Sequence, residues 1–254
     1  MKHALIGGTG FYDMSFLDNP RAQIVRTPFG SITAYIGHYQ GEEITFLARH
    51  GPEHNQLAHE INYRANIWGL RELGIERILA TSAVGSLNLA MQVGHLVVPD
   101  NLVDMAKHRR DSFNLGSVDF TYPYCAEMRR VICERAAALH AEVHPQAIYL
   151  SVEGPRYETA AEIKLWNRLG MDVVGMTNGT EAALARELGI CYAVIGLVTD
   201  LAAGLQETPP DLETHKHVVQ DNLPRLRDLA LAVLRALPVS RGCLCASQAA
   251  KPVR

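Results

Sequence analysis

Residues 4–13, ALIGGTGFYD, pass from an apolar strand directly into a glycine-rich turn. Closely spaced glycines after a strand are typical of α/β proteins that bind phosphate groups, because backbone N–H groups can approach the ligand there. A dinucleotide-binding turn needs a third small residue where this chain has Asp13, and a triphosphate-binding loop needs a Lys-Ser or Lys-Thr that is also missing. The turn therefore favours a single phosphate, with Thr9 offering a hydroxyl, although an ordinary tight turn explains the glycines equally well.

Short apolar runs alternate with amphipathic stretches along the rest of the chain. The runs predict strands at residues 3–8, 43–50, 77–83, 95–100, 147–154, 172–177 and 191–200. The amphipathic stretches predict helices at residues 60–73, 124–140, 159–169, 179–188 and 211–237. This alternation predicts an α/β fold with one mixed or parallel sheet flanked by helices, as a single domain over residues 1–238. Residues 101–122 are expected to form a long irregular connection, and residues 239–254 a peripheral or mobile tail.

Composition and charge exclude several classes of protein. The net charge is −3, and the one short basic cluster, residues 107–110, is too small for a nucleic-acid surface. No apolar run reaches the roughly 18 residues of a membrane span, and the first residues carry no signal segment. We therefore expect a soluble cytoplasmic protein with neither a nucleic-acid nor a membrane partner.

The cysteines argue against both a disulfide framework and a metal site. They are five in number, scattered at Cys125, Cys133, Cys191, Cys243 and Cys245, and no pair has the spacing of zinc ligands. Free thiols are therefore expected, without a metal. Cys243 and Cys245 could close a small, strained disulfide ring or remain two thiols, and the sequence leaves both open.

Three consecutive strand ends near the N-terminus carry groups that bind anions. In α/β folds ligands gather beyond the carboxyl ends of the strands. Thr9 follows the first strand, and Arg49 and His50 follow the next. Arg49 offers a guanidinium with several fixed N–H donors, and His50 an imidazole whose donor capacity changes with protonation. Ser82 and the small Ala83 then offer a hydroxyl and accessible backbone groups. Each group alone fits a turn or a surface salt bridge, but together they predict an oxyanion site.

The later strand ends carry groups that suit a planar heterocycle. Tyr157 offers an aromatic face and Glu158 a carboxylate, although Glu158 could also be an ordinary residue at a helix N-terminus. Met176 and Thr177 place an adaptable apolar side chain beside a hydroxyl, where a core methionine is the alternative. Asp200 ends an apolar strand, where desolvation raises the pKa of a carboxyl group and lets it donate a proton.

These motifs together resemble the methylthioadenosine phosphorylase and purine nucleoside phosphorylase family. The similarity extends over residues 2–238, in the order IGGTG, FLARHG, NYRANIW, SAVGSL, VEGPRYET, GMTNGTEAALARELGICYA and VTD. The resemblance implies a nucleoside-phosphorylase fold with a mixed, twisted central sheet, assembled as a homotrimer or a dimer of trimers. It also implies reversible phosphorolysis of an N-glycosidic bond, with phosphate as co-substrate and with neither a metal nor an organic cofactor.

The resemblance also assigns a role to each candidate site residue. Phosphate is expected to bind Thr9, Arg49, His50, Ser82, Ala83 and Thr177. Met176 is expected against the ribose and Tyr157 near the base, with Asp200 placed to donate to purine N7 and His50 and Asp200 as the catalytic residues. Phosphate would stabilise the positive charge that develops on the ribosyl ring, and the donor at N7 the negative charge on the departing purine.

The choice of nucleoside depends on Glu158 and Asp200. Methylthioadenosine phosphorylases resemble one another in an Asp-x-Asp that reads adenine, whereas this chain has Ala202 in place of the second Asp. Glu158 matches the Glu with which purine nucleoside phosphorylases accept N1–H of a 6-oxopurine. His215, with His217 as a rival, aligns with their 5′-hydroxyl ligand. We therefore expect inosine or guanosine as substrate. The alternative is methylthioadenosine or methylthioinosine, and an NAD-dependent dehydrogenase or a non-catalytic nucleoside-binding module is less favoured.

Overall fold

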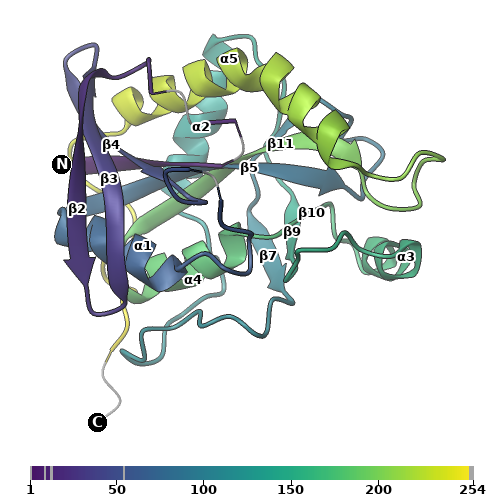
Figure 1. The fold of residues 1–254 in the computed structure, drawn as a ribbon, viewed down its shortest axis with the longest axis horizontal. Helices are drawn as coiled ribbons and strands as arrows, with labels where there is room; N and C mark the ends of the chain where they lie inside the picture. Colours follow the sequence, from purple (N-terminus) through teal and green to yellow (C-terminus); the bar gives the residue numbers. More distant parts are fainter. Residues whose placement is uncertain (1, 9, 12–13, 54, 252–254) are drawn as a thin grey trace.

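Strand β5 (Ile75–Ser86) crosses the centre of the molecule, and the rest of the sheet is built on its two edges (Figure 1). The computed structural model describes residues 2–8, 10–11, 14–53 and 55–251. Most side chains of β5 are buried regardless of the face to which they point. This burial is expected of a strand that helices cover on both faces.

The two edges of β5 carry different partners. β11 (Cys191–Leu201) pairs in parallel with almost the whole of β5 on one edge. On the other edge, β1 (Lys2–Gly7) pairs in parallel with the first half of β5, and β10 (Val173–Gly175) pairs antiparallel with its last residues. The sheet is thus mixed, with the order β2-β3-β4-β1-β5-β10-β9-β7 and with β11, β6 and β8 joined through β5. The remaining strands are β2 (Asp18–Thr27), β3 (Gly30–Tyr39), β4 (Glu42–Ala48), β6 (Leu96–Val97), β7 (Asn101–Asp104), β8 (Val143–His144) and β9 (Ile148–Ser151).

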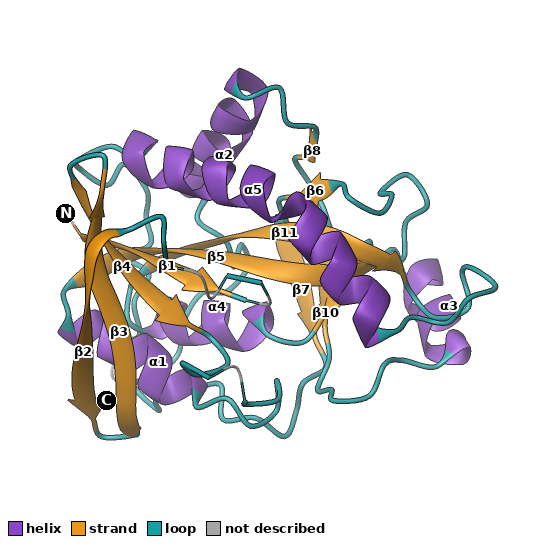
Figure 2. Ribbon diagram, turned by 45° about the horizontal axis from the view of Figure 1, so that its top comes forward, coloured by secondary structure: helices purple, strands orange, loops and turns teal. Residues whose placement is uncertain are grey.

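Two pairs of helices cover the two faces of this sheet (Figure 2). On one face α2 (Ala126–Ala138) packs against α5 (Leu212–Ala236), and on the other α1 (Tyr63–Glu72) packs against α4 (Asn178–Glu187). α3 (Ala160–Arg168) lies apart, beyond β9 and β10 (Figure 1). Among the residues described, no helix has the length and apolar character that a membrane span requires.

The side chains of β11 alternate between the two helical layers. Ala193 and Ile195 belong to the core cluster that includes α2 and α5, whereas Tyr192 and Val194 belong to the cluster that includes α1 and α4. Successive residues of a strand point to opposite faces of the sheet. A strand between two helical layers is therefore apolar at nearly every position, which is why the run 191–200 predicts it from the sequence.

The predicted α/β fold is confirmed, and each predicted strand and helix is present with different ends. The largest difference is at β6, where only Leu96 and Val97 of the predicted run 95–100 form a strand. The apolar pattern does not predict the hairpin of β2 and β3, because most side chains of β2 are exposed and the strand lacks a buried face. The expectation that residues 101–122 are irregular throughout is wrong at their start. Residues 101–104 form β7, which extends the sheet in parallel with β9.

The described part of the tail, residues 239–251, packs on the rest of the chain. The buried Arg77 donates to the carbonyls of Pro238 and Ser240 over 2.7 and 3.1 Å. The Gly242 N–H donates to the Glu127 carboxylate over 2.9 Å. The tail therefore has fixed partners on β5 and α2, while its separation from the domain at residue 238 stays a prediction.

Candidate active site

The edge of β5 that carries β1 and β10 is interrupted near its middle. β1 pairs as far as Ala80 and β10 pairs from Gly85 onward, so the two strands part beside residues 81–84. A cavity of about 460 Å³ lies at this point, lined by Gly8, which follows β1, and by Val174 and Gly175 of β10. Ligands of α/β sheets bind where neighbouring strands diverge in this way, because the loops there leave a crevice.

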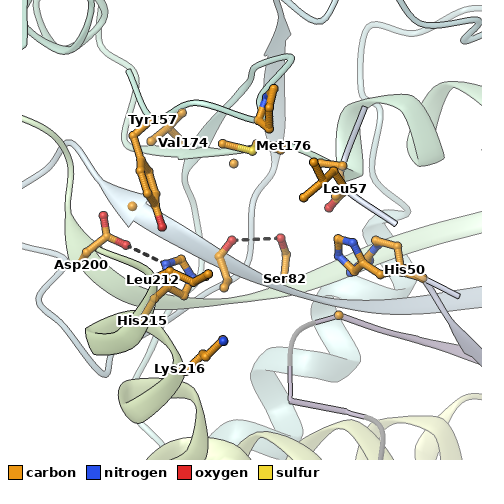
Figure 3. Close-up of a pocket in the computed structure, with 18 of the residues that line it drawn as sticks. His50, Leu57, Ser82, Tyr157, Val174, Met176, Asp200, Leu212, His215 and Lys216 are labelled. Carbon is orange, nitrogen blue, oxygen red and sulfur yellow. Dashed lines mark hydrogen bonds and ion pairs between the residues drawn. The ribbon is translucent and has the colours of Figure 1, made fainter. Parts of the chain in front are cut away.

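The structure places ten of the predicted site residues around this one cavity (Figure 3). They are Arg49, His50, Ser82, Ala83, Tyr157, Glu158, Met176, Thr177, Asp200 and His215. Thr9 lies outside the described residues. The lining includes His215 and not its rival His217. The roles given to these residues stay predictions, but their convergence from six separate segments makes one site of them.

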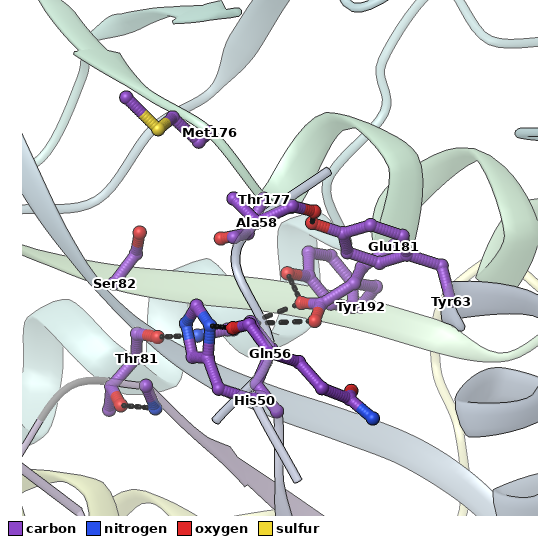
Figure 4. A network of polar contacts seen from close by, with 12 residues as sticks. His50, Gln56, Ala58, Tyr63, Thr81, Ser82, Met176, Thr177, Glu181 and Tyr192 are labelled. Carbon is purple, nitrogen blue, oxygen red and sulfur yellow. Dashed lines mark hydrogen bonds and ion pairs between the residues drawn. The ribbon is translucent and has the colours of Figure 1, made fainter. Parts of the chain in front are cut away.

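Arg49 forms a buried ion pair at the phosphate-binding part of the predicted site (Figure 4). Its Nε and Nη2 donate to the Glu181 carboxylate over 2.6 and 3.0 Å, and its Nη1 donates to the Thr81 carbonyl over 2.7 Å. The Tyr192 hydroxyl donates to the same carboxylate over 2.6 Å. Gly8 makes room for this arrangement, since a Cβ there would lie 2.7 Å from Nη1.

The ion pair keeps Arg49 charged inside the protein. Burial by itself lowers the pKa of Arg49, but the neighbouring Glu181 carboxylate outweighs this and raises the pKa above its usual value. The contacts of Arg49 with the described residues use three of the five guanidinium N–H groups. Because Arg49 also lines the cavity, its guanidinium can donate to an anion bound there.

The other anion-binding groups surround Arg49. Nδ1 of His50 lies 2.9 Å from the Gln56 carbonyl, and since a carbonyl only accepts, Nδ1 carries the hydrogen. Ser82 and Thr177 place buried hydroxyl-bearing side chains on the cavity wall. Thr177 is also the N-cap of α4, so the positive end of that helix dipole lies at the cavity. A guanidinium, an imidazole, two hydroxyls and a helix N-terminus form a site for an oxyanion.

A β-bulge turns Asp200 toward the cavity. Val198 pairs with Val84 and Asp200 pairs with Gly85, so Thr199 is an extra residue in β11. A bulge of this kind redirects the side chains that follow it. A Cβ on Gly85 would lie 3.1 Å from Asp200 Oδ2, so the glycine also leaves room for the carboxyl group.

Asp200 is coupled to His215 through Thr199. The Thr199 hydroxyl donates to Asp200 Oδ1 over 2.8 Å and lies 3.0 Å from His215 Nε2. His215 Nδ1 lies 3.6 Å from Asp200 Oδ1 (Figure 3). Burial raises the pKa of Asp200, and His215 opposes that shift. Burial lowers the pKa of His215. The arrangement therefore favours a neutral imidazole beside a carboxyl group that holds its proton more tightly than an exposed one.

Glu158 is a cavity residue rather than a residue of the helix that follows. The N-cap of α3 is Thr159, which forms a capping box with Glu162, so Glu158 precedes the helix. Burial raises the pKa of Glu158, and the neighbouring Asp200 raises it further. Stabilisation by the helix dipole would lower this pKa. Glu158, Asp200 and Tyr157 thus form an acidic, aromatic part of the cavity, distinct from the cationic part at Arg49.

Sequence reasoning missed the residues that hold the site residues in place. Glu181 and Tyr192 fix Arg49, and Thr199 links Asp200 to His215. One signal could have found Glu181: an acidic residue on an otherwise apolar helix face needs a buried cation as partner. Tyr192 and Thr199 fit the strand pattern, and no local feature of the sequence distinguishes them.

Arg109, in the connection between β7 and α2, holds parts of the cavity wall together. Its guanidinium donates to the carbonyls of Glu153 and Met176, to the Glu153 carboxylate over 3.2 Å and to the Tyr63 hydroxyl over 3.2 Å. Glu153 lies on the loop before Tyr157, Met176 lies on the segment after β10, and Tyr63 is the first residue of α1. Arg109 therefore ties together two segments that form the cavity wall.

Among the described residues, one group of side chains has the geometry of a metal site. It consists of Cys125, Cys191, Cys243 and Cys245. None of the four lines the cavity.

Comparison with known proteins assigns the chain to a family. Residues 2–235 match the model of the phosphorylase superfamily. The chain is 47% identical over 251 residues to a probable 6-oxopurine nucleoside phosphorylase of Dictyoglomus turgidum, covering 96% of this chain and 95% of the relative. It is 44% identical to the 6-oxopurine nucleoside phosphorylase of Pyrococcus furiosus, covering 95% of each chain, and 38% identical to the S-methyl-5′-thioadenosine phosphorylase of the same organism, covering 96% of each.

Solved structures agree with this assignment. Methylthioadenosine phosphorylase from Schistosoma mansoni in complex with adenine superimposes with a TM-score of 0.91 at 28% identity, over 95% of this chain and 93% of that one. A methylthioadenosine phosphorylase from an antarctic soil metagenomic library gives a TM-score of 0.88 at 31% identity, over 98% of this chain and 90% of that one. The chain therefore belongs to the phosphorylase superfamily and, within it, to the family of purine nucleoside and methylthioadenosine phosphorylases.

Proposed function

We propose that the protein is an enzyme that catalyses the reversible phosphorolysis of 6-oxopurine nucleosides, inosine and guanosine, to the free base and ribose 1-phosphate. The observation that carries the proposal is the division of one cavity into a cationic part at Arg49 and an acidic part at Glu158 and Asp200. An oxyanion suits the first part and the N–H edge of a heterocycle suits the second. The names of the relatives at 44 to 48% identity support the same substrate class.

The cationic part would hold phosphate against the ribose. Arg49, with its charge fixed by Glu181, and His50 would bind the anion, and the hydroxyls of Ser82 and Thr177 and the N-terminus of α4 would orient it. Phosphate then attacks C1′ as the bond to the purine lengthens. Positioning the two substrates lowers the barrier without an activated protein nucleophile, and the phosphate charge stabilises the oxocarbenium-like ribosyl group.

The acidic part would read and protonate the base. An ionised Glu158 accepts from N1–H of hypoxanthine or guanine, whereas the N1 of adenine has no hydrogen to donate. A protonated Asp200 donates to N7 and stabilises the departing purine. The raised pKa of Asp200 supports this assignment, because an ionised carboxylate at that place would repel both N7 and O6.

The second candidate is phosphorolysis of S-methyl-5′-thioadenosine or S-methyl-5′-thioinosine. Two observations favour it: the apolar Leu212 lines the cavity, and His215 is occupied with Thr199 and Asp200. A 5′-methylthio group needs an apolar neighbour, whereas a 5′-hydroxyl needs a hydrogen-bonding partner. Relatives at 36 to 38% identity carry the name methylthioadenosine phosphorylase.

A substrate panel separates the two candidates. We would compare kcat/KM for base release from inosine, guanosine, adenosine, methylthioinosine and methylthioadenosine, each with and without phosphate. The proposal expects inosine or guanosine to lead and turnover to depend on phosphate. A lead by methylthioadenosine would contradict the role of Glu158, and binding without phosphate-dependent turnover would contradict the enzymatic function.

We further propose that the enzyme works in the cytoplasm in purine salvage, as a homotrimer or a dimer of trimers, and that its reaction needs no metal or organic cofactor. The family to which the chain belongs supports these expectations. Light scattering after gel filtration measures the assembly directly. A monomer that is fully active would contradict the proposed oligomer.

A further inference from the structure

Four of the five cysteines meet at one place, although they come from three distant parts of the chain. Cys125 is the N-cap of α2, Cys191 is the first residue of β11, and Cys243 and Cys245 belong to the tail. Their Sγ atoms all lie within 4.8 Å of one another. Cys125, Cys191 and Cys245 are buried and Cys243 is half-buried. The fifth cysteine, Cys133, is not part of this cluster.

The distances between the four sulfur atoms fit a tetrahedral metal site. With zinc–sulfur bonds of about 2.3 Å, the edges of a tetrahedron of four thiolates are about 3.8 Å long. The Sγ atoms of Cys191 and Cys243 are 3.3 Å apart, and the largest separation in the cluster is below 4.8 Å. We propose that Cys125, Cys191, Cys243 and Cys245 bind one thiophilic divalent metal ion, Zn²⁺, as a structural four-thiolate site.

The surroundings of the cluster suit a site with negative charge. On binding, Zn²⁺ replaces the four thiol protons, which leave to solvent, and two negative charges remain on the site. Cys125 caps α2 without a side-chain hydrogen bond to the helix, so the positive end of the helix dipole faces the cluster. The Arg241 guanidinium donates to the Gly189 carbonyl over 3.0 Å, two residues before Cys191. The acidic Glu127 in the first turn of α2 is paired with Arg77 at 3.0 Å.

Disulfide bonds are the competing use of the same sulfurs. A bond between Cys243 and Cys245 closes a small, strained ring. Any other disulfide joins only two sulfurs. It leaves unexplained why each of the four sulfurs lies close to the other three. In the cytoplasm proposed above, thiols stay reduced in most organisms other than hyperthermophiles, and clustered cysteines there more often bind a metal.

The metal would fasten the tail to the end of the sheet that is remote from the cavity. Cys191 begins β11 and Asp200 lies near its end, so about 30 Å of strand separates the cluster from the catalytic carboxyl group. Gly189, in a left-handed conformation, lets the tail backbone approach, since its added Cβ would lie 3.3 Å from Ala246. The site therefore acts on stability, and the proposal does not depend on the proposed reaction.

The test is the metal content of the full-length protein, purified under reducing conditions without a chelator. Elemental analysis by mass spectrometry is expected to find about one zinc per chain. Exchange with Co²⁺ should give the intense sulfur-to-cobalt charge-transfer bands and visible bands of a tetrahedral thiolate site. Removal of the metal should lower the thermal midpoint, with kcat/KM for inosine at moderate temperature unchanged.

Matched variants keep the proposal falsifiable. Cys243→Ser and Cys245→Ser should each lose most of the bound zinc, whereas Cys133→Ser, outside the cluster, should keep it. Zinc well below half an ion per chain in the wild type would overturn the proposal. So would peptide mapping without reduction that finds the four cysteines in disulfides, or zinc that persists in both tail variants. A protein that holds zinc but lacks phosphorolysis would contradict only the proposed reaction.

Discussion

Two carboxyl groups of the cavity lower the stability of the folded protein but serve its proposed function. Glu158 is half-buried and Asp200 is buried, both line the same cavity, and burial raises the pKa of both. A buried carboxylate without a cation costs folding free energy whenever it is ionised. In the proposed complex a substrate N–H that donates to the Glu158 carboxylate offsets that cost, so the unliganded protein carries a destabilised site that binding relieves.

Replacing Glu158 by glutamine should stabilise the protein at neutral pH. Because the folded-state pKa of Glu158 is raised, the folded protein holds its proton to higher pH than the unfolded chain does, and stability falls as pH rises through that pKa. Glu158→Gln removes this loss. Urea unfolding should show a higher free energy of unfolding for the variant at pH 7, with the difference vanishing below about pH 4, the range of an unfolded-state carboxyl group.

The exposed Glu134, which pairs with Arg130 on the surface of α2, is the control for that experiment. Glu134→Gln should change stability by less than about 1 kcal/mol at either pH. Two results would show that Glu158 is not the destabilised group. One is a Glu158→Gln variant that is less stable than wild type at pH 7, and the other is a change in its free energy of unfolding that is the same at both pH values. The same variant should lose kcat/KM for inosine more than for adenosine.

Replacing Glu181 by glutamine should have the reverse effect. The variant leaves Arg49 charged, buried and without its counter-ion. Removal of one partner of a buried ion pair costs about 3–5 kcal/mol, and the less fixed guanidinium should raise KM for phosphate. Tyr192→Phe removes one hydrogen bond from the same carboxylate and should cost about 1–3 kcal/mol. Equal stability of Glu181→Gln and wild type in urea would contradict the role of the pair.

At the scale of single elements, caps and irregularities place the site residues. The bulge at Thr199 orients Asp200, the capping box at Thr159 ends the loop that carries Glu158, and the N-cap Thr177 places the start of α4 at the cavity. Each device is local, and each acts at the boundary between an element and a loop. The regular parts of the strands and helices supply the rigid frame.

The N-cap of α5 offers a test at this scale. The Asp211 carboxylate accepts from the N–H groups of Glu213 and Thr214 over 2.9 Å, and His215 lies in the turn that it caps. Asp211→Ala should cost about 1 kcal/mol and raise KM for the nucleoside, because the first turn that carries His215 loosens. Asp211→Asn keeps a capping oxygen and should behave as wild type in steady-state kinetics. Equal KM values for Asp211→Ala and Asp211→Asn would show that the N-cap of α5 does not affect nucleoside binding.

At the scale of the whole molecule, the active site and the tail lie at opposite ends of the central strands. The cavity forms where β1 and β10 part along β5, and the tail packs near the beginning of β5 and β11 through Arg77 and the cysteine cluster. Because β5 and β11 are buried along their length, they connect the two ends rigidly. The tail is therefore expected to influence stability more than catalysis.

Truncation after Pro238 tests this separation. The shortened chain loses the bond from Arg77 to the Ser240 carbonyl and the packing of Cys245. Each lost hydrogen bond costs about 0.5–1.5 kcal/mol, so calorimetry should record a thermal midpoint lower by several degrees. Values of kcat/KM at 25 °C should stay within about twofold of wild type. A folded but inactive truncation would mean that the tail shapes the cavity.

The amino-acid sequence by itself predicted the five helices, seven of the strands and ten of the residues that line the cavity. Those predictions depend on local periodicity and on polar residues in or just after a buried strand, such as Arg49, Ser82 and Asp200. Strands β2, β3, β7 and β8 were missed. β2 is largely exposed, and a strand without a buried face has no such periodicity.

Only the tertiary structure decided the contacts between side chains that are remote along the chain. Arg49 and Glu181 are 132 positions apart, and the cysteine cluster joins α2, β11 and the tail. Such pairs have no spacing rule, because the path of the chain between them is set by the packing of all the other elements. The sequence could name ten groups that line the cavity, but the folded chain had to bring together the groups that hold them.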